Sequence, residues 1–428
     1  MRKVVLTGLG IVSPLGIGKE DFWQGLSSGR SATKHLSRMR SCQLFEEFNF
    51  ASQVISEVDD FDPVRSGLPG EVCKLDRFIQ FAVAGALQAV RDARLDIQAM
   101  ERERAGIALA TAICGTRQME SEFIKVTDRG RAEIDPALVS PDLYLASMSN
   151  TPGVILSAMM GWQGPCVTLS TGCIGGLDAI GYAYETIRDG DADIMLTGAS
   201  EAPITPITIA SFEIIHCLSK EHNDEPERAS RPFDARRDGF VLSEGCGILL
   251  LEEMEHARRR GAHIYAEIAG FSNTSNALHM TDLLSDGADL ARAMAGALEQ
   301  SNLEPSEVDF MHAHASSTPQ NDSCETSAIK LLFGEHAYKI PVNGTKSMLG
   351  HALSAASAIE LAACVLSFEH SFIHPTINYE VPDPLCDLDY VPNEGRAWDG
   401  DVILTNASGF AGLHASMVLK AFRGEEIV

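Results

Sequence analysis

The sequence has no excess of basic residues. It contains 34 lysine and arginine residues against 59 aspartate and glutamate residues, which gives a formal net charge of −25. A chain of this charge repels the phosphate backbone of nucleic acids instead of neutralising it. We therefore expect no nucleic-acid partner.

Long apolar runs are also missing. None approaches the roughly 18–20 residues that a membrane-spanning helix needs, so no membrane span is expected. The N-terminal stretch MRKVVLTGLGIVSPLG begins with a basic pair and an apolar segment, as a signal peptide does. Its alternation and its interruptions at Gly8, Gly10 and Pro14 favour a buried strand followed by a turn.

The ten cysteines form no CxxC pair. This absence argues against a zinc site and against a thiol redox motif, and no metal is expected. Cys246 and Cys364 lie in apolar surroundings, which is typical of buried reduced thiols. The expected compartment is a reducing cytoplasm.

The chain of 428 residues is long enough for a large core, and no linker rich in Pro, Ser or Gly divides it. Short apolar runs alternate with Ala-rich stretches of helical periodicity, which predicts an α/β fold with helices covering the sheets. The expected strands are Arg2–Thr7, Ala105–Thr111, Asp193–Thr197, Gly247–Leu251, Ile264–Ala269 and Val402–Thr405, and the expected helices include Arg77–Ala93 and Gly287–Gln300.

Two segments repeat one pattern. Val167–Arg188 and Val342–Glu369 each indicate a strand, a turn and a helix that begins with small residues. Two halves of similar architecture would explain the repeat. A chance likeness between two buried helices explains it equally well.

A thiol at the start of a helix is the first candidate for chemistry. Cys173 lies in LSTGCIGGLDAIGYA, directly after an apolar run and directly before a helical pattern. The partial positive charge of a helix N-terminus favours the thiolate, which is the nucleophilic form. A cysteine among glycines is as often a packing residue, so the motif alone leaves both interpretations open.

A histidine follows an apolar strand in DFMHAHASSTPQND. His314 is delivered to a polar loop that is rich in turn formers. His312 would lie on the same strand face if the strand continued that far. For His312 we favour the interpretation that it has no catalytic role.

A second histidine motif is GTKSMLGHALSAASAIE. We place His351 at the start of a helix, where the dipole keeps an imidazole neutral and able to donate to a developing enolate oxygen. A lysine in so apolar a stretch needs a partner, and Glu360 is the natural partner of Lys346. For this pair we favour a structural ion pair over proton transfer.

The C-terminal stretch NASGFAGLHASMVL predicts a strand, a Gly-rich turn and a second strand. Such a turn can aim backbone N–H groups at an oxyanion, although an ordinary tight hairpin has the same pattern.

Taken together and in this order, the four segments resemble the β-ketoacyl-acyl carrier protein synthases of the thiolase superfamily. The family pattern is a nucleophilic Cys in mid-chain, an AHG-type motif, a KS-x-x-GH motif and a C-terminal GFGG-type loop. This sequence supplies Cys173, His314, Lys346 with His351, and the turn formed by Ser408, Gly409 and Phe410. The stretches VLTGLGIVSPLG, ASRPFDARRDGFVLSEG and PDPLCDLDYVPN extend the resemblance over nearly the whole chain.

Within this family the sequence is most similar to the ketosynthase α subunit of type II polyketide synthases. The resemblance is carried by STGCIGGLDAIGYA, by HMTDL and by Ser408, where fatty-acid synthases usually have a bulky Phe. The presence of Cys173 distinguishes the chain from the related chain length factor, which lacks this residue. Ile174, Ala315 and Ala411 depart from the family pattern and put the substrate choice in doubt more than the activity.

The resemblance implies a thiolase fold, with two pseudo-repeated βαβαβαββ-type halves packed as a five-layered α-β-α-β-α structure. The N-terminal half, residues 1–255, would carry the nucleophile, and the C-terminal half, residues 256–428, would carry both histidine motifs.

The resemblance also implies a mechanism. Cys173 would hold the acyl chain, with the N–H groups of Cys173 and Ser408 as the oxyanion hole. His314 and His351 would stabilise the enolate formed when malonyl-carrier loses CO₂, and Lys346 with Glu360 would orient them. No bound cofactor is implied, because the 4′-phosphopantetheine arm comes with the acyl carrier protein.

The implied partners are an acyl carrier protein and a homologous subunit, the chain length factor, in a heterodimer. Lys74, Arg77 and Lys220 are candidates for docking the acidic carrier. The alternatives are a homodimeric fatty-acid elongation synthase, a non-catalytic chain-length-factor-like subunit, and a thiolase, which would need a second Cys near the C-terminus. The sequence does not specify the starter unit, the chain length or the product.

Overall fold

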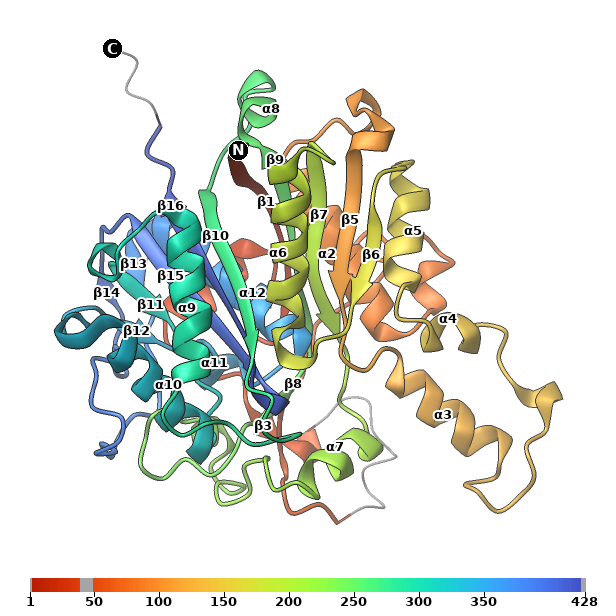
Figure 1. The fold of residues 1–428 in the computed structure, drawn as a ribbon. Coiled ribbons are helices and arrows are strands. Elements are labelled where there is room, and N and C mark those ends of the chain that lie inside the picture. The colour runs from red at the N-terminus through yellow and green to blue at the C-terminus, as the bar shows by residue number, and fades with distance from the viewer. Residues whose placement is uncertain (1, 39–48, 425–428) are drawn as a thin grey trace.

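A single mixed sheet runs through the computed structural model, which describes residues 2–38 and 49–424 (Figure 1). Its strand order is β12-β11-β15-β16-β10-β1-β9-β7-β5-β6, with β2 paired to β1. The strands are β1 Val4–Ser13, β2 Gly16–Ile17, β5 Ala105–Ala110, β6 Cys166–Leu169, β7 Ile194–Glu201, β9 Gly245–Glu253, β10 Ala266–Ser275, β11 Phe310–His312, β12 Val342–Asn343, β15 Val402–Gly409 and β16 Leu413–Ala421. Smaller sheets contain β3 Lys34–His35, β4 Val54–Ser56, β8 Leu242–Ser243, β13 Phe372–Ile373 and β14 Arg396–Ala397.

The sheet is two similar halves joined at their centre. Read outward from the junction, β1-β9-β7-β5-β6 matches β10-β16-β15-β11-β12 in order and direction of pairing. The halves meet where β1 pairs antiparallel with β10, from Val4 opposite Ile268 to Leu6 opposite Ala266. The repeat in the sequence therefore corresponds to a repeated structural unit. In the first half β6 leads into α6, and in the second half β12 leads towards α12.

Helices form three layers around the two half-sheets. The helices are α1 Lys19–Ser27, α2 Arg77–Asp92, α3 Thr116–Val126, α4 Leu143–Ser147, α5 Thr151–Met160, α6 Gly175–Asp189, α7 Pro206–Glu213, α8 Met254–Arg259, α9 Ala288–Ser301, α10 Pro319–Phe333, α11 Lys346–Leu349 and α12 Ser354–His370. The helices α2 and α5 cover the N-terminal half-sheet, α9 and α10 lie over the C-terminal half, and α6 and α12 pack against each other between them. This arrangement confirms the thiolase-like architecture.

The central helices are buried because of their composition. All residues of α12 from Ser354 to Ser367 are buried, as expected for a helix that is apolar on every side. The helix α6 approaches it closely: a Cβ added at Gly176 would lie 2.5 Å from the carbonyl oxygen of Ser354. These small residues bring the starts of both helices to the same point.

The N-terminal segment is a fully buried strand, which confirms the strand interpretation. β1 extends further than the sequence suggested, because its glycines do not end it. A Cβ on Gly10 would lie 1.8 Å from the carbonyl oxygen of Gly85, so glycine is needed here for α2 to pack on the strand. Among the described residues, no helix is long and apolar enough to cross a bilayer.

Candidate active site

One cavity brings the predicted reactive residues together. Cys173, His314 and His351 line it, and so do Ser408, Gly409 and Phe410. The cavity is narrow, about 60 Å³, and its wall also contains Phe240, Thr281, Leu283, Ser316, Thr318, Gln320 and Asn321. A wider polar groove of about 620 Å³ lies along parts of residues 13–30 and 58–60, but no Cys or His is among the described residues that line it.

Cys173 is held between β6 and α6. It lies in a single 3₁₀ turn, Gly172–Ile174, that leads directly into α6. The hydroxyl of Ser354, at the start of α12, donates to the carbonyl oxygen of Gly172 over 2.7 Å. The two central helices therefore fix the position of the sulfur.

The expected thiolate is not the resting form of Cys173. Burial raises the pKa of the thiol to about 12, with Lys346 opposing this shift and Glu201 adding to it. The prediction that the helix start stabilises the thiolate is therefore wrong for the free protein. The loss of hydration outweighs the partial charge of one helix end.

His314 follows β11 and is fixed through its backbone. The N–H groups of His314 and Ala315 donate to the buried carboxylate of Glu325 over 2.7 and 2.9 Å. Burial, helped by Lys346, lowers the pKa of His314 well below its usual value. Since the Lys346 ammonium can only donate, its 3.3 Å contact with Nδ1 assigns the His314 proton to Nε2.

His351 faces His314, with ring centroids 5.2 Å apart at nearly right angles. Its backbone N–H donates to the carbonyl oxygen of Val241, directly before β8, over 2.7 Å. The imidazole is neutral, as predicted, because burial and then Lys346 lower its pKa well below the usual value. The helix dipole, which was the expected cause, does not explain this pKa, because His351 lies before α12, which begins at Ser354.

Lys346 and Glu360 form the predicted buried ion pair. Their N and O atoms are 2.5 Å apart, and each side chain is 2% exposed. Burial raises the pKa of Glu360 to about 7 against the opposing effect of Lys346. Lys346 also donates to the carbonyl oxygen of His314 over 2.7 Å, so the pair holds that histidine in place.

His312 is not among the residues that line the cavity. It is buried at the end of β11, and its Nε2 lies 2.7 Å from the hydroxyl of Thr345. This contact joins β11 to the turn that carries Lys346.

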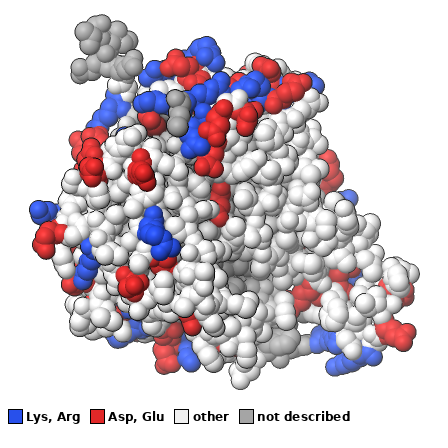
Figure 2. Space-filling model, viewed as in Figure 1, with Lys and Arg blue, Asp and Glu red and all other residues white. Residues whose placement is uncertain are grey.

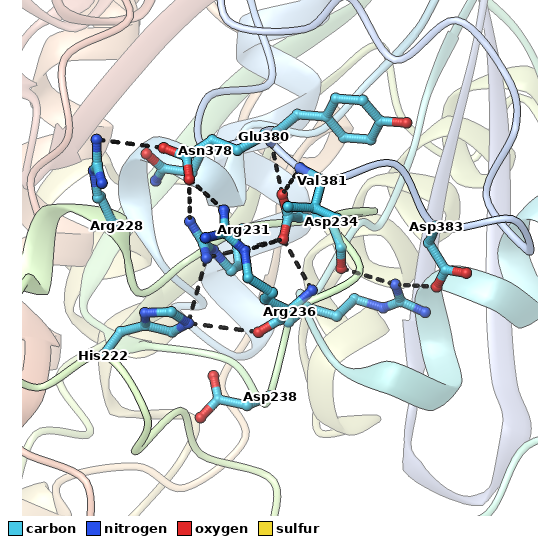
Figure 3. Close-up of polar contacts among 12 residues, drawn as sticks. His222, Arg228, Arg231, Asp234, Arg236, Asp238, Asn378, Glu380, Val381 and Asp383 are labelled. Atoms are coloured by element: carbon cyan, nitrogen blue, oxygen red, sulfur yellow. Dashed lines mark hydrogen bonds and ion pairs between the residues drawn. The ribbon is translucent and has the colours of Figure 1, made fainter.

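An arginine network lies beside the loop that carries His314, and Figure 3 shows its polar contacts around Arg231, Asp234 and Glu380. Arg231, 1% exposed, lies 3.9 Å from Asp234 and 3.5 Å from Glu380. Its backbone N–H donates to the hydroxyl of Ser317 over 2.9 Å. Arg237 donates to the carbonyl oxygens of Thr318 and Pro319. The network therefore fixes the outer wall of the cavity.

The Gly-rich turn joins β15 to β16, as predicted. Ala411 occupies it with a φ of 64°, a left-handed conformation in a position where the family pattern has Gly. The turn faces Cys173: a Cβ on Gly409 would lie 3.8 Å from the backbone N of Cys173.

Two of the three docking candidates lie on the surface. Lys74 and Lys220 are exposed. Arg77 is not available, because its guanidinium donates to Val58 and to the buried carboxylate of Glu244 at 2.7 Å and packs over Phe81. Its assignment to the docking surface is corrected, since it stabilises the start of α2.

Sequence reasoning missed three buried acids and a histidine. Glu325 and Glu201 accept backbone N–H groups beside the cavity, from His314 and Ala112 respectively. His414 and Asp289 lie behind the Gly-rich turn. The signal that could have identified them is an acidic or histidine residue within an otherwise apolar pattern. Among the described residues, no three His, Cys, Asp or Glu side chains are grouped so as to hold a metal ion.

Comparisons with known proteins cover almost the whole chain. The model of the β-ketoacyl synthase N-terminal domain matches residues 1–257, and that of the C-terminal domain matches residues 265–380. A putative polyketide β-ketoacyl synthase 1 from Streptomyces halstedii is 47% identical over 420 residues, 98% of each chain.

Two solved structures share the fold. One is described as a type II polyketide synthase acyl-carrier protein in complex with its ketosynthase bound to the hexaketide. It is 43% identical, covers 98% of this chain and 99% of that chain, and has a TM-score of 0.91. The ishigamide ketosynthase/chain length factor is 33% identical, with 98% and 99% coverage and a TM-score of 0.88.

Proposed function

The chain belongs to the β-ketoacyl synthase family and is an acyltransferase of the polyketide type, and we propose that Cys173 holds the growing acyl chain. The observation that carries the proposal is the shared cavity of Cys173, His314 and His351. One thiol and two neutral imidazoles suit a decarboxylative Claisen condensation, in which malonyl-carrier extends the acyl chain.

Loading is a transfer between thioesters. The Cys173 sulfur forms a bond to the acyl carbonyl carbon, the bond to the carrier thiol breaks, and the Cys173 proton passes to the departing sulfur. A neutral resting thiol is compatible with this exchange, because no net charge remains in the cavity. The N–H groups of Cys173 and Ser408 would hold the oxyanion, and losing one such donor costs roughly 3–4 kcal/mol.

Decarboxylation would use the two histidines as hydrogen-bond donors. His314 carries its proton on Nε2, and we assign the same donor role to His351. Both would bind the thioester oxygen of the malonyl group as CO₂ leaves and the enolate forms. Neutral donors suit this step, because an imidazolium would transfer its proton to the carbanion and end the reaction.

Condensation completes the cycle. The carbanion attacks the Cys173 thioester, a carbon–carbon bond forms, and the Cys173 sulfur leaves as a thiolate, which takes up a proton from water to restore the resting thiol. Lys346, paired with Glu360, keeps the His314 ring in its tautomer. Gly409 and Phe410, which line the cavity, would form the part of its wall against which the acyl chain lies.

The test separates loading from decarboxylation. In the Cys173→Ala variant, acyl loading should disappear from the intact-protein mass spectrum. In the His351→Ala variant, loading should persist while CO₂ release from malonyl-carrier falls roughly 100-fold, since one positioned donor is lost. Loading that persists without Cys173 would move the nucleophile elsewhere, and equal loss of both steps in His351→Ala would refute the division of roles.

The partners proposed for this chain are an acyl carrier protein and a homologous chain length factor, as named in the two solved relatives. A face with few charged residues supports the second (Figure 2). It lies over α5 and the edge strand β6, where Val154, Met159 and Cys166 are exposed. Partner subunits prefer such faces to charged ones. An active homodimer on purification would favour the fatty-acid type instead.

Carrier docking is proposed for Lys74 and Lys220, because an acidic carrier needs a local basic patch on an acidic enzyme. The carrier would supply its phosphopantetheine arm, and the hydroxyls of Ser316 and Thr318 offer hydrogen bonds to the arm along the cavity wall. We further propose a boundary between the halves at residues 255 and 256, and a cytoplasmic location.

A further inference from the structure

A second polar array lies behind the Gly-rich turn. The hydroxyl of Ser408 is 2.9 Å from Nδ1 of His414. Nε2 of the same ring is 3.1 Å from Oδ2 of Asp289. A hydroxyl, an imidazole and a carboxylate in series are the arrangement that activates a serine nucleophile.

The array is buried but opens at one end. Ser408 is 3% exposed, and His414 and Asp289 are fully buried. Ser408 lines the same cavity as Cys173, His314 and His351. A substrate acyl group in that cavity would therefore meet the serine end of the array.

Each member comes from a rigid element. Ser408 on β15 and His414 on β16 are directly opposite in the strand register. Asp289 is in the first turn of α9, and its second oxygen accepts the N–H of Leu290 over 3.0 Å. The His414 ring thus lies between the Ser408 hydroxyl and the Asp289 carboxylate.

The protonation of the ring suits a general base. Burial lowers the pKa of His414, with Asp289 opposing the shift and Arg292 adding to it. Oδ2 of Asp289 lies 3.1 Å from Nε2 and its negative charge favours the proton on that nitrogen, although the two atoms are not aligned for a hydrogen bond, and Nδ1 is then left to accept from the Ser408 hydroxyl. Ser408 is therefore poised to lose its proton to His414.

The neighbouring pair shows that the hairpin itself does not need this array. Two positions along the register, on the same face of the sheet, Ser416 donates to the Asn406 side chain over 2.7 Å. That pair satisfies a buried serine with a neutral amide. Burying a histidine and a carboxylate beside a serine hydroxyl costs more desolvation free energy than burying a neutral amide there. This extra cost indicates a chemical role for the array.

We propose that Ser408 is a second acyl acceptor, which hydrolyses acyl thioesters in the cavity and releases the chain as a carboxylic acid. The substrate class rests on the proposed function, because that function brings acyl thioesters to this wall.

Acyl transfer to Ser408 and hydrolysis of the resulting ester need no reactant other than water. The Ser408 oxygen forms a bond to the thioester carbonyl carbon, its proton passes to Nδ1 of His414, and the departing sulfur takes that proton to become a thiol. Water then attacks the ester, its proton passes to His414, and the Ser408 oxygen leaves and recovers the proton. The products are a free thiol and a carboxylic acid.

The experiment uses the full-length Cys173→Ala protein and a small alkyl fluorophosphonate, which labels activated serines. Peptide mass spectrometry should find the phosphonyl group on Ser408. The label should be absent when Ser408→Ala is added. With His414→Gln added, which keeps a hydrogen-bonding side chain but no base, labelling should slow by roughly 100-fold or more. The matched control, Ser416→Ala, should label at the parent rate.

A second readout is hydrolysis of an acyl N-acetylcysteamine thioester by the Cys173→Ala protein, which should disappear with Ser408→Ala. An unlabelled Ser408, or equal labelling rates in the parent and in His414→Gln, would overturn the proposal and leave the array as a brace for the turn. Because neither readout needs Cys173, failure of acyl loading on the wild-type protein would refute only the proposed function.

Discussion

At the scale of single residues, burial decides the protonation of the reactive groups. It raises the pKa of Cys173 to about 12 and lowers the pKa values of His314 and His351 well below their usual range. All three groups are therefore neutral near pH 7. A neutral cavity can bind a neutral acyl thioester. Its hydrogen-bond donors then interact more strongly with the enolate that forms later than with the bound substrate.

The reactivity of Cys173 should show this protonation directly. Because its pKa lies near 12, the thiolate fraction rises about tenfold with each pH unit below that value. Alkylation of Cys173 by iodoacetamide, followed on its peptide by mass spectrometry, should accelerate accordingly from pH 7 to 10. A plateau reached below pH 9 would show that the thiolate is stabilised after all.

The pair of Lys346 and Glu360 gives a second prediction. Lys346→Met leaves Glu360 buried without its partner and should lower the free energy of unfolding by about 3–5 kcal/mol. The double variant Lys346→Met with Glu360→Leu should recover most of that stability in urea unfolding. Its decarboxylation should stay roughly 100-fold low, because His314 has lost its orienting cation. Recovery of the rate together with the stability would contradict the orienting role.

At this scale, the sequence predicted which residues share the cavity and that His351 is neutral, but not the protonation of Cys173. The spacing of the four motifs led to Cys173, His314 and His351. The resting protonation of Cys173 depends on how much water the folded chain excludes, which no local pattern contains. For the same reason Arg77 was assigned to the surface, although Glu244, distant in sequence, pairs with it.

At the scale of elements, the starts of α6 and α12 determine where Cys173 lies. Gly175 and Gly176 allow α6 to touch α12, and Ser354 holds the Gly172 carbonyl. The helices themselves were predictable from their periodicity. The contact between them was suggested only by the small residues at both starts.

A methyl group at this contact should disturb both stability and chemistry. Gly176→Ala would place its Cβ 2.5 Å from the Ser354 carbonyl oxygen, so we expect a loss of about 1–3 kcal/mol in urea unfolding and slower acyl loading. Gly70→Ala is the matched control, since a Cβ there meets no atom within 4 Å. Equal effects of the two substitutions would show that the helix contact does not position Cys173.

At the scale of the whole molecule, the two halves contribute different parts of one site. The N-terminal half carries Cys173, and the C-terminal half carries both histidines and the Gly-rich turn. The family resemblance implied two halves, whereas the sequence repeat alone left them open, and neither showed that β1 and β10 join the halves into one sheet. Pairing between strands so distant in sequence leaves no local pattern.

The face over α5 and β6 should contact the partner subunit. Val154, whose side chain is 54% exposed, lies on this face, and Val154→Glu places a charge there. Because charged residues are depleted from interface cores, the substitution should weaken co-purification with a co-expressed chain length factor at least about tenfold. Val64→Glu, at a site 73% exposed, is the matched control and should leave the complex intact. Undiminished binding by Val154→Glu would place the interface on another face.

The most direct test of the account is chain extension itself. The wild-type protein, purified with its partner subunit, is first loaded with an acyl chain and then given malonyl-carrier protein, and the carrier-bound products are analysed by intact mass spectrometry. The account predicts a carrier-bound β-ketoacyl chain longer by one –CH₂–CO– unit, with release of CO₂, and no such product from Cys173→Ala. An extended chain formed without Cys173, or no extension by a correctly loaded wild-type complex, would contradict it.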